Sequence, residues 1–357
     1  MFSEKLLHWY DENGRDLPWR KTNDPYKIWL SEIILQQTRI EQGKDYWFRF
    51  IENYPTIKEL AAASEEEVLK LWQGLGYYSR ARNLHAAAIY IEKELDGRFP
   101  DSYDEILKLK GVGKYTAAAI ASFAFKEPRP VIDGNVYRFI SRVFCIETPI
   151  GTDKAHGEFE RVLNNLIDKE NPDLFNQALM DFGSTYCKPS GCDCDNCIFA
   201  QECMAKLEGK VEFLPIKGQV VEKKRRYLYY LDIQWNEDGR QMTIFQQRDN
   251  KDIWKGLYEF PLFESTQELG EKEMWAKVKE LISTVTKDGA ETLEVSCTMN
   301  HQLTHRDIRA TFIKAILKNG KLPKGTKWQV MTIDDIKRKP ISRLIDRYLK
   351  KGDATSF

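Results

Sequence analysis

The chain has 357 residues, of which 42% are hydrophobic and 30% are charged. This composition is typical of a globular protein and excludes an intrinsically disordered one, and the length indicates two domains. The 54 basic and 54 acidic residues cancel, so the overall charge does not indicate a nucleic-acid partner. The longest nearly apolar stretch, residues 117–125, is too short to span a membrane, and the first residues lack a signal-peptide pattern. We therefore expect a cytoplasmic protein without a membrane partner.

Residues 28–38 are predicted to form a buried helix, because apolar side chains surround its helical wheel almost completely. Glu32 falls among these apolar positions. Burial disfavours the charged form of a carboxyl group and raises its pKa, which suits a general acid at neutral pH. The alternative is a structural ion pair between Glu32 and a nearby arginine.

Polar side chains follow at the ends of predicted helices. Gln37 and Thr38 close the segment of Glu32, and Tyr77 comes directly after the glycine pair Gly74 and Gly76. Amides and tyrosines at exposed helix ends can enter a base stack and hydrogen-bond base edges. Taken singly, each of these side chains is explained as well or better by packing or by an ordinary surface position.

The segment Gly111-Val112-Gly113-Lys114 lies between two predicted helices, which is the helix–hairpin–helix pattern. Its glycines allow the backbone to approach a phosphate, and the N-terminal amides of the second helix attract the anion. Gly111, Gly113 and Lys114 are therefore predicted to contact a DNA backbone. Asp133 follows about twenty residues later, in Asp133-Gly134-Asn135, and strengthens this interpretation.

Five of the seven cysteines fall between Cys187 and Cys203. In a protein that is not secreted, such a cluster indicates a metal site rather than disulfides. Four of them have the spacing C-x6-C-x2-C-x5-C, and they are Cys187, Cys194, Cys197 and Cys203. This set can ligate zinc or a 4Fe–4S cluster. A single CxxC pair favours iron–sulfur, but spacing alone leaves both open.

The hydrophobic pattern changes from helical to alternating near residue 225. Predicted strands cover residues 227–235, 241–248 and 309–317, and predicted helices cover 270–286 and 341–350. We therefore predict an all-α domain over residues 1–206, a linker over 207–224 and an α+β domain over 225–357.

Five segments together resemble the adenine DNA glycosylase (MutY) family of the helix–hairpin–helix DNA glycosylase superfamily. They are Leu30–Thr38, Gly74–Asn83, the hairpin at Gly111–Gly113, Asp133–Val136 and the cysteine loop 187–203. The resemblance implies a helix–hairpin–helix glycosylase domain with one 4Fe–4S cluster, followed by a Nudix-like domain. It also implies a bacterial, nucleoid-associated monomer that binds double-stranded DNA and excises adenine mispaired with 8-oxoguanine or guanine.

The resemblance assigns roles to individual residues. Glu32 is the proposed donor that protonates adenine N7, and Asp133 is the carboxylate that stabilises the sugar cation, as paired carboxylates do in sugar hydrolases. Asn135 and Tyr115 support this pair. The residues that match the family's adenine pocket are Trp19, Arg20 and Gln177. Those expected around the lesion are Gln37, Thr38 and Tyr77.

In this family a loop of the Nudix-like domain contacts 8-oxoguanine through a Phe-Ser-His triplet. The corresponding stretch is expected to be Met299-Asn300-His301, so Asn300 and His301 are predicted to contact the lesion.

Three alternatives remain at this point. An endonuclease III-like glycosylase/lyase for oxidised pyrimidines would need a lysine two residues after the second hairpin glycine, where this chain has Tyr115. A Nudix pyrophosphohydrolase would need an Arg-Glu-x-x-Glu-Glu segment, which is absent after Gly256. A non-enzymatic iron–sulfur DNA-binding protein is disfavoured because Glu32 and Asp133 are both present.

Overall fold

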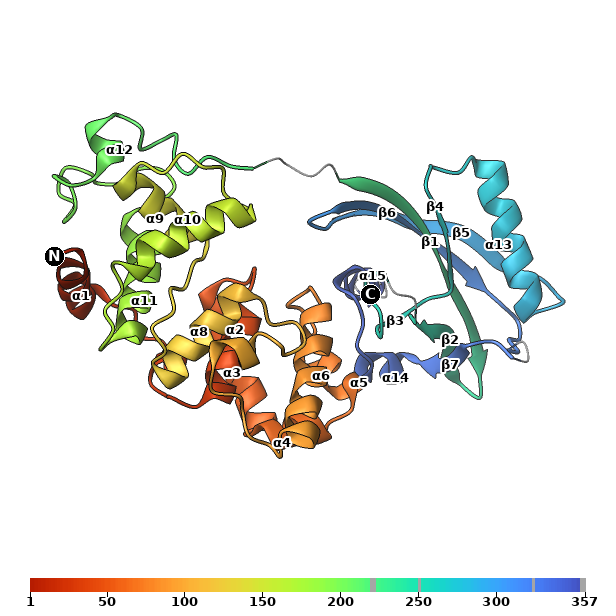
Figure 1. Cartoon of the computed structure of the whole chain (residues 1–357). Helices are drawn as coiled ribbons and strands as arrows, with labels where there is room; N and C mark the ends of the chain where they lie inside the picture. Colours follow the sequence, from red (N-terminus) through yellow and green to blue (C-terminus); the bar gives the residue numbers. More distant parts are fainter. Residues whose placement is uncertain (219–222, 250–251, 323–324, 354–357) are drawn as a thin grey trace. The chain divides into compact units, whose positions relative to one another are not determined.

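The computed structural model describes residues 1–218, 223–249, 252–322 and 325–353. The chain divides into two compact units (Figure 1). The first comprises Met1–Ala62 and Asn83–Gln219, and the second comprises Ala63–Arg82 and Val220–Phe357. No helix of the described residues is both long and apolar enough to cross a membrane.

The first unit is helical, as predicted. Its elements are α1 (Phe2–Asn13), η1 (Pro18–Arg20), α2 (Pro25–Leu35), α3 (Ile40–Asn53), α4 (Ile57–Ala62), most of α6 (Ser79–Glu94), α7 (Tyr103–Ile106), α8 (Lys114–Phe125), α9 (Gly134–Phe144), α10 (Asp153–Asn164), α11 (Pro172–Asp181), η2 (Phe182–Tyr186) and α12 (Met204–Leu207). Helix α2 packs against α8, which has five alanines among its 12 residues. This contact brings the segment of Glu32 next to the second helix of the hairpin pattern, which begins directly after Gly113.

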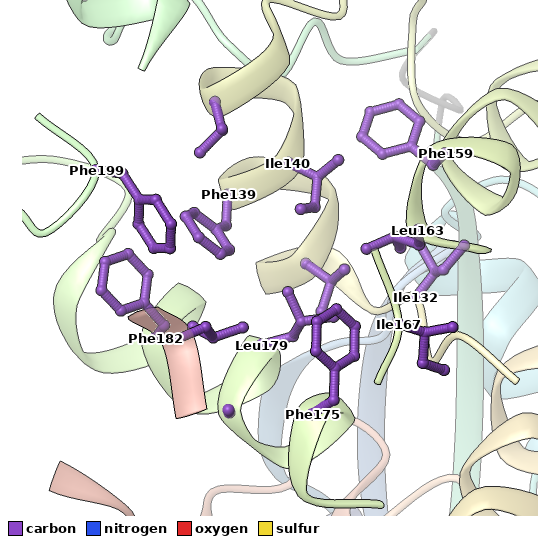
Figure 2. Packing of buried hydrophobic residues seen from close by; sticks show 14 of the residues in the cluster. Ile132, Phe139, Ile140, Phe159, Leu163, Ile167, Phe175, Leu179, Phe182 and Phe199 are labelled. Carbon is purple, nitrogen blue, oxygen red and sulfur yellow. The ribbon is translucent and has the colours of Figure 1, made fainter. Parts of the chain in front are cut away.

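An aromatic core holds α9 in place (Figure 2). Phe139 projects from α9 toward Phe182 and Phe199, and its ring lies 4.6 Å from that of Phe182 and 5.4 Å from that of Phe199. Burial of each such side chain stabilises the fold by about 1.5–3 kcal/mol. The packing therefore fixes α9, and with it the position of Asp133 at its N-terminus.

The second unit combines helices with a sheet, as expected for the predicted α+β domain, and this sheet is mixed. Its strands are β1 (Lys224–Glu237), β2 (Arg240–Gln247), β3 (Tyr258–Glu259), β4 (Leu262–Ser265), β5 (Thr292–Gln302), β6 (Arg306–Ile316) and β7 (Trp328–Thr332). The order is β3-β2-β1-β6-β5, with β4 on β1 and β7 on β2. Strands β1 and β6 pair in parallel, and every other named pair is antiparallel.

Helices cover both faces of this sheet, which explains its apolar residues on alternating sides. One face, with Leu228 and Tyr230, packs against α14 (Ile333–Arg338) and α15 (Arg343–Asp353). The other, with Tyr229 and Leu231, packs against α13 (Glu271–Val285). Helix α5 (Glu65–Leu71) belongs to the second unit, where Glu66 accepts a hydrogen bond from Tyr258 at 2.9 Å.

Candidate functional site

A cavity of about 590 Å³ lies in the first unit. Elements far apart in the sequence form its walls, among them η1, α2, α8, α9 and α11. Nine of the predicted site residues line it, and they are Trp19, Arg20, Glu32, Gln37, Thr38, Tyr115, Asp133, Asn135 and Gln177. The structure therefore gathers in one place side chains that the sequence distributes over 159 positions, from 19 to 177.

Glu32 is buried in the middle of α2, with 6% of its surface exposed. Burial is the main cause that raises its pKa to about 7; a hydrogen bond from Tyr115 and the charge of Arg20 oppose this shift, and the charge of Asp133 adds to it. A substantial fraction of this carboxyl therefore carries its proton at neutral pH. In the described part of the chain Glu32 forms no ion pair with an arginine, which was the alternative; the nearby Arg15 and Arg20 pair with Asp181.

Tyr115 is half-buried on the first turn of α8, and desolvation of its hydroxyl raises its pKa well above the ordinary value. Its hydroxyl remains a neutral donor to Glu32. The hydrogen bond orients the Glu32 carboxyl within the cavity.

Asp133 is the N-cap of α9, and its carboxylate is anchored by three N–H groups. Oδ1 accepts from the backbone N of Asn135 at 2.8 Å and of Val136 at 2.7 Å, and Oδ2 accepts from Asn135 Nδ2 at 2.8 Å. The positive end of the helix dipole also attracts the charge. A fixed carboxylate at the wall of the cavity is suited to stabilise a cation.

Asn135 is itself held by a side chain of the same helix. Arg138 donates from Nη2 to Asn135 Oδ1 at 2.9 Å and from Nε to the Cys187 carbonyl at 2.8 Å. Gly183 leaves room for this arrangement, because a Cβ there would lie 2.7 Å from the Asn135 carbonyl oxygen. These contacts connect the Asp133 segment to the start of the cysteine loop.

Arg20 and Gln177 are also held in place by hydrogen bonds with side chains that do not line the cavity. Asp181 is fully buried and accepts from Arg20 Nη1 at 2.8 Å and from Nη2 at 2.7 Å. Arg15 donates to the same carboxylate. Tyr10 donates to Gln177 Oε1 at 2.7 Å. Sequence reasoning missed Tyr10, Arg15 and Asp181, since an isolated charged or aromatic residue carries no local signal.

The hairpin glycines adopt the conformations that the pattern requires. Gly111 has φ = 82°, and a Cβ there would lie 2.5 Å from Asn83 Cβ, so a larger residue does not fit. Gly113 caps α8, whose first residue is Lys114. The Lys114 ammonium is exposed and lies 3.2 Å from the Asp153 carboxylate.

Gln37 and Tyr77 share an unusual backbone conformation, with φ of 59° and 47°. Residues other than glycine seldom adopt it, and such strain is concentrated at functional positions. Gln37 is exposed at the cavity mouth, whereas Tyr77 lies in the second unit with 47% of its surface exposed. The Tyr77 hydroxyl contacts the Thr304 hydroxyl.

The expectation that Met299-Asn300-His301 forms a loop is wrong. These residues lie inside β5 and pair with Ala310, Arg309 and Ile308 of β6. The turn comes later, at Leu303–His305, because the alternating pattern continues through Gln302. Leu303-Thr304-His305 also has the order apolar, hydroxyl, histidine, which is the signal that sequence reasoning overlooked. Asn300 and His301 instead line a separate polar pocket with Arg225 and Arg309.

The four spaced cysteines line one cavity, together with Cys192. The Sγ atoms of Cys187 and Cys192 lie 3.4 and 3.2 Å from Arg142 Nη1. Burial raises the pKa of Cys187 and of Cys197 to about 11, so their thiolate forms require a bound cation. Among the described residues, no three His, Cys, Asp or Glu side chains lie in positions that could hold a metal ion. The donor set nevertheless fits a thiolate-bound cluster, because all four sulfurs border the same space.

Comparison with known proteins agrees with this architecture. Residues 30–165 match the HhH-GPD superfamily of base excision DNA repair proteins, and residues 233–351 match the NUDIX domain. The chain is 34% identical over 282 residues to an adenine DNA glycosylase of Buchnera aphidicola subsp. Acyrthosiphon pisum (strain APS), and the aligned region covers 79% of each protein. It is 41% identical over 234 residues to an adenine DNA glycosylase of Rattus norvegicus, and the aligned region covers 62% of this chain and 45% of that protein.

Solved structures give the same fold for the first unit. A thermostable thymine-DNA glycosylase matches with a TM-score of 0.55 and 29% identity, over 58% of this chain and 95% of that one. A non-covalent Endonuclease III–DNA complex matches with a TM-score of 0.51 and 22% identity, over 58% and 94%. With a relative above 30% identity aligned along most of both sequences, the chain belongs to the adenine DNA glycosylase family.

Proposed function

We propose that this protein is a monofunctional glycosylase that hydrolyses the N-glycosidic bond of adenine mispaired with 8-oxoguanine or guanine in double-stranded DNA. The observation that carries the proposal is the arrangement of Glu32, Tyr115 and Asp133 around one cavity, with the pKa of Glu32 near 7. A base inside a duplex is out of reach of this cavity, so the adenosine must be flipped out of the stack.

Glu32 supplies the proton in the first step. It transfers its proton to adenine N7, and the C1′–N9 bond breaks with its electron pair going to the base. The sugar is left with positive charge, which the anchored Asp133 carboxylate stabilises. Glu32, now ionised, takes a proton from water as the water oxygen bonds to C1′. Trp19, Arg20 and Gln177 line the space for the base.

A lyase step is not supported by the side chains of the cavity. A Schiff base requires an amine at the sugar, and no lysine lines this cavity in the described part of the chain. Tyr115 stands where the lyase lysine would be, and it is engaged with Glu32. Lys114 is exposed and paired with Asp153. The endonuclease III-like alternative is therefore disfavoured.

The four spaced cysteines are proposed to hold one 4Fe–4S cluster. When bound, the cluster would supply the positive charge that keeps these four sulfurs as thiolates and would cross-link the loop 187–203. Cys192 falls outside the spacing and donates to the Lys188 carbonyl at 2.9 Å.

The DNA contacts are proposed from the surface features. Gly111, Gly113 and Lys114 would bind the backbone, with Gln37 and Thr38 at the cavity mouth. The turn Leu303–His305 and Tyr77 would contact 8-oxoguanine, with Thr304 as the candidate hydroxyl and Asn300 and His301 as the earlier candidates. The domain limits of 1–206 and 225–357, a monomeric state and a location at the nucleoid complete the proposal.

The decisive experiment is single-turnover incubation with duplexes that hold adenine opposite 8-oxoguanine, guanine or thymine. Excision opposite the first two is expected, with strand breaks only after alkali. Glu32→Gln should abolish excision while duplex binding persists, and Glu41→Gln, an exposed carboxyl of α3, is the matched control. Normal excision by Glu32→Gln would contradict the proposed mechanism, and strand breaks without alkali would contradict the monofunctional assignment.

A further inference from the structure

Tyr10 lies behind two side chains of the adenine cavity and is not itself part of its wall. Its hydroxyl donates to Gln177 Oε1 at 2.7 Å, and its ring lies 5.7 Å from the Arg20 guanidinium. Helix α1, which carries Tyr10, packs against α11, which carries Gln177. The catalytic steps described above do not use Tyr10, so its contacts require another explanation.

The hydrogen bond selects one of two orientations of the Gln177 amide. A glutamine amide has an acceptor oxygen at one end and a donor NH2 at the other, and rotation by 180° exchanges them. In the orientation present, Oε1 faces the Tyr10 hydroxyl. Burial raises the pKa of Tyr10, so the hydroxyl keeps its proton. In the rotated amide, NH2 would donate to the phenol oxygen and the phenolic proton would lose its acceptor, which disfavours that orientation beside the buried Gln177 side chain.

Amide orientation matters because purines differ in their hydrogen-bonding pattern. Adenine has a donor 6-amino group beside the acceptor N1, whereas hypoxanthine has an acceptor 6-oxygen beside a donor N1–H. Since Glu32 is proposed to reach N7, the amide is left for the 6-amino group and N1. The second lone pair of Oε1 accepts from the amino group, and Nε2 donates to N1. The rotated amide would match hypoxanthine instead.

We propose that Tyr10 is a positioning residue that fixes the Gln177 amide and thereby makes the cavity selective for adenine over 6-oxopurines. The inference rests on the proposed function, because it concerns the base that this cavity excises. Tyr10 touches neither base nor sugar and acts through Gln177.

The test measures a ratio of rates, which a general loss of structure does not change. Full-length, cluster-loaded protein is incubated with duplexes that hold adenine or hypoxanthine opposite 8-oxoguanine. Tyr10→Phe should lower the ratio of adenine to hypoxanthine excision by about fivefold, the effect of one hydrogen bond of about 1 kcal/mol. Tyr137→Phe is the matched control, because Tyr137 packs its ring against Phe159 in the same domain, and the ratio should stay unchanged.

A double-mutant cycle separates positioning from other effects. In the Gln177→Ala background, Tyr10→Phe should cause no further change in the ratio, since no amide remains to be oriented. An unchanged ratio in Tyr10→Phe, or an equal decrease in both backgrounds, would overturn the inference. A wild-type protein that excises no adenine would instead overturn the proposed function.

A second measurement does not depend on the stability of Tyr10→Phe. In 1-deazaadenine a C–H group replaces N1, so the donor from Gln177 loses its acceptor. Wild-type protein should excise this base about fivefold more slowly than adenine, and Gln177→Ala should reduce that difference. Equal rates for the two bases in wild-type protein would contradict the orientation of the amide.

Discussion

Glu32→Gln is expected to stabilise the folded protein at neutral pH while it removes the proposed proton donor. Burial raises the pKa of Glu32 from its ordinary value of 4.5 to about 7. Between these pH values the native state keeps the proton, whereas the unfolded chain releases it. The stability contributed by the neutral carboxyl is therefore complete below pH 4.5 and is lost as pH rises to 7. At about 1.4 kcal/mol per pH unit, the loss is about 3 kcal/mol.

Glutamine does not titrate, so the variant should gain stability relative to wild type by about 3 kcal/mol between pH 4.5 and 7. For a domain of this size the gain corresponds to about 6–12 °C in the midpoint of thermal unfolding. Scanning calorimetry of both proteins between pH 4.5 and 8 measures it, with Glu41→Gln as the control. A difference between variant and wild type that is the same at pH 4.5 and at pH 8 would refute the burial of a neutral acid.

Three further outcomes concern the lyase, the cluster and the lesion. Borohydride should trap little covalent complex with wild-type protein, and efficient trapping that depends on Lys114 would contradict the monofunctional assignment. Cys192→Ala should keep the absorbance of a 4Fe–4S cluster at about 400 nm, whereas Cys197→Ala should lose it. Stoichiometric zinc in protein prepared without oxygen would exclude the cluster. Thr304→Ala should retain excision opposite guanine but lose part of the preference for 8-oxoguanine, by about 1 kcal/mol, and an unchanged preference would exclude Thr304 as a reader.

Local patterns were sufficient for part of the elements of the second unit, namely β1, β2, β6, α13 and α15, but not for β3, β4, β5, β7 and α14. Alternation predicted β1 and β2 because each strand buries one side chain in two on each face of the sheet. Glu32 was identifiable because it interrupts an apolar helix, and a buried carboxyl has few explanations. The cysteine loop was identifiable because its ligands are close in sequence.

Long-range contacts were not predictable in the same way. Asp181 holds Arg20 across 161 positions, and Tyr10 holds Gln177 across 167, so neither pair leaves a periodic pattern. Helix α5 begins with a capping box, which predicts a helix but not the unit against which it packs. The turn at Leu303–His305 was misplaced because β5 continues through the triplet Met299–His301 and ends at Gln302.

The central claim is that Glu32 donates a proton from within the cavity while the Asp133 carboxylate stabilises the cation that forms on the sugar. The pH dependence of the single-turnover rate constant for adenine opposite 8-oxoguanine tests it most directly. With a pKa near 7 for the donor, the rate constant should be nearly constant below pH 6 and fall about tenfold for each pH unit above 7. Any residual rate of Glu32→Gln should lack this decrease. A wild-type rate constant that does not change between pH 6 and 9 would contradict the assignment of Glu32 as the acid.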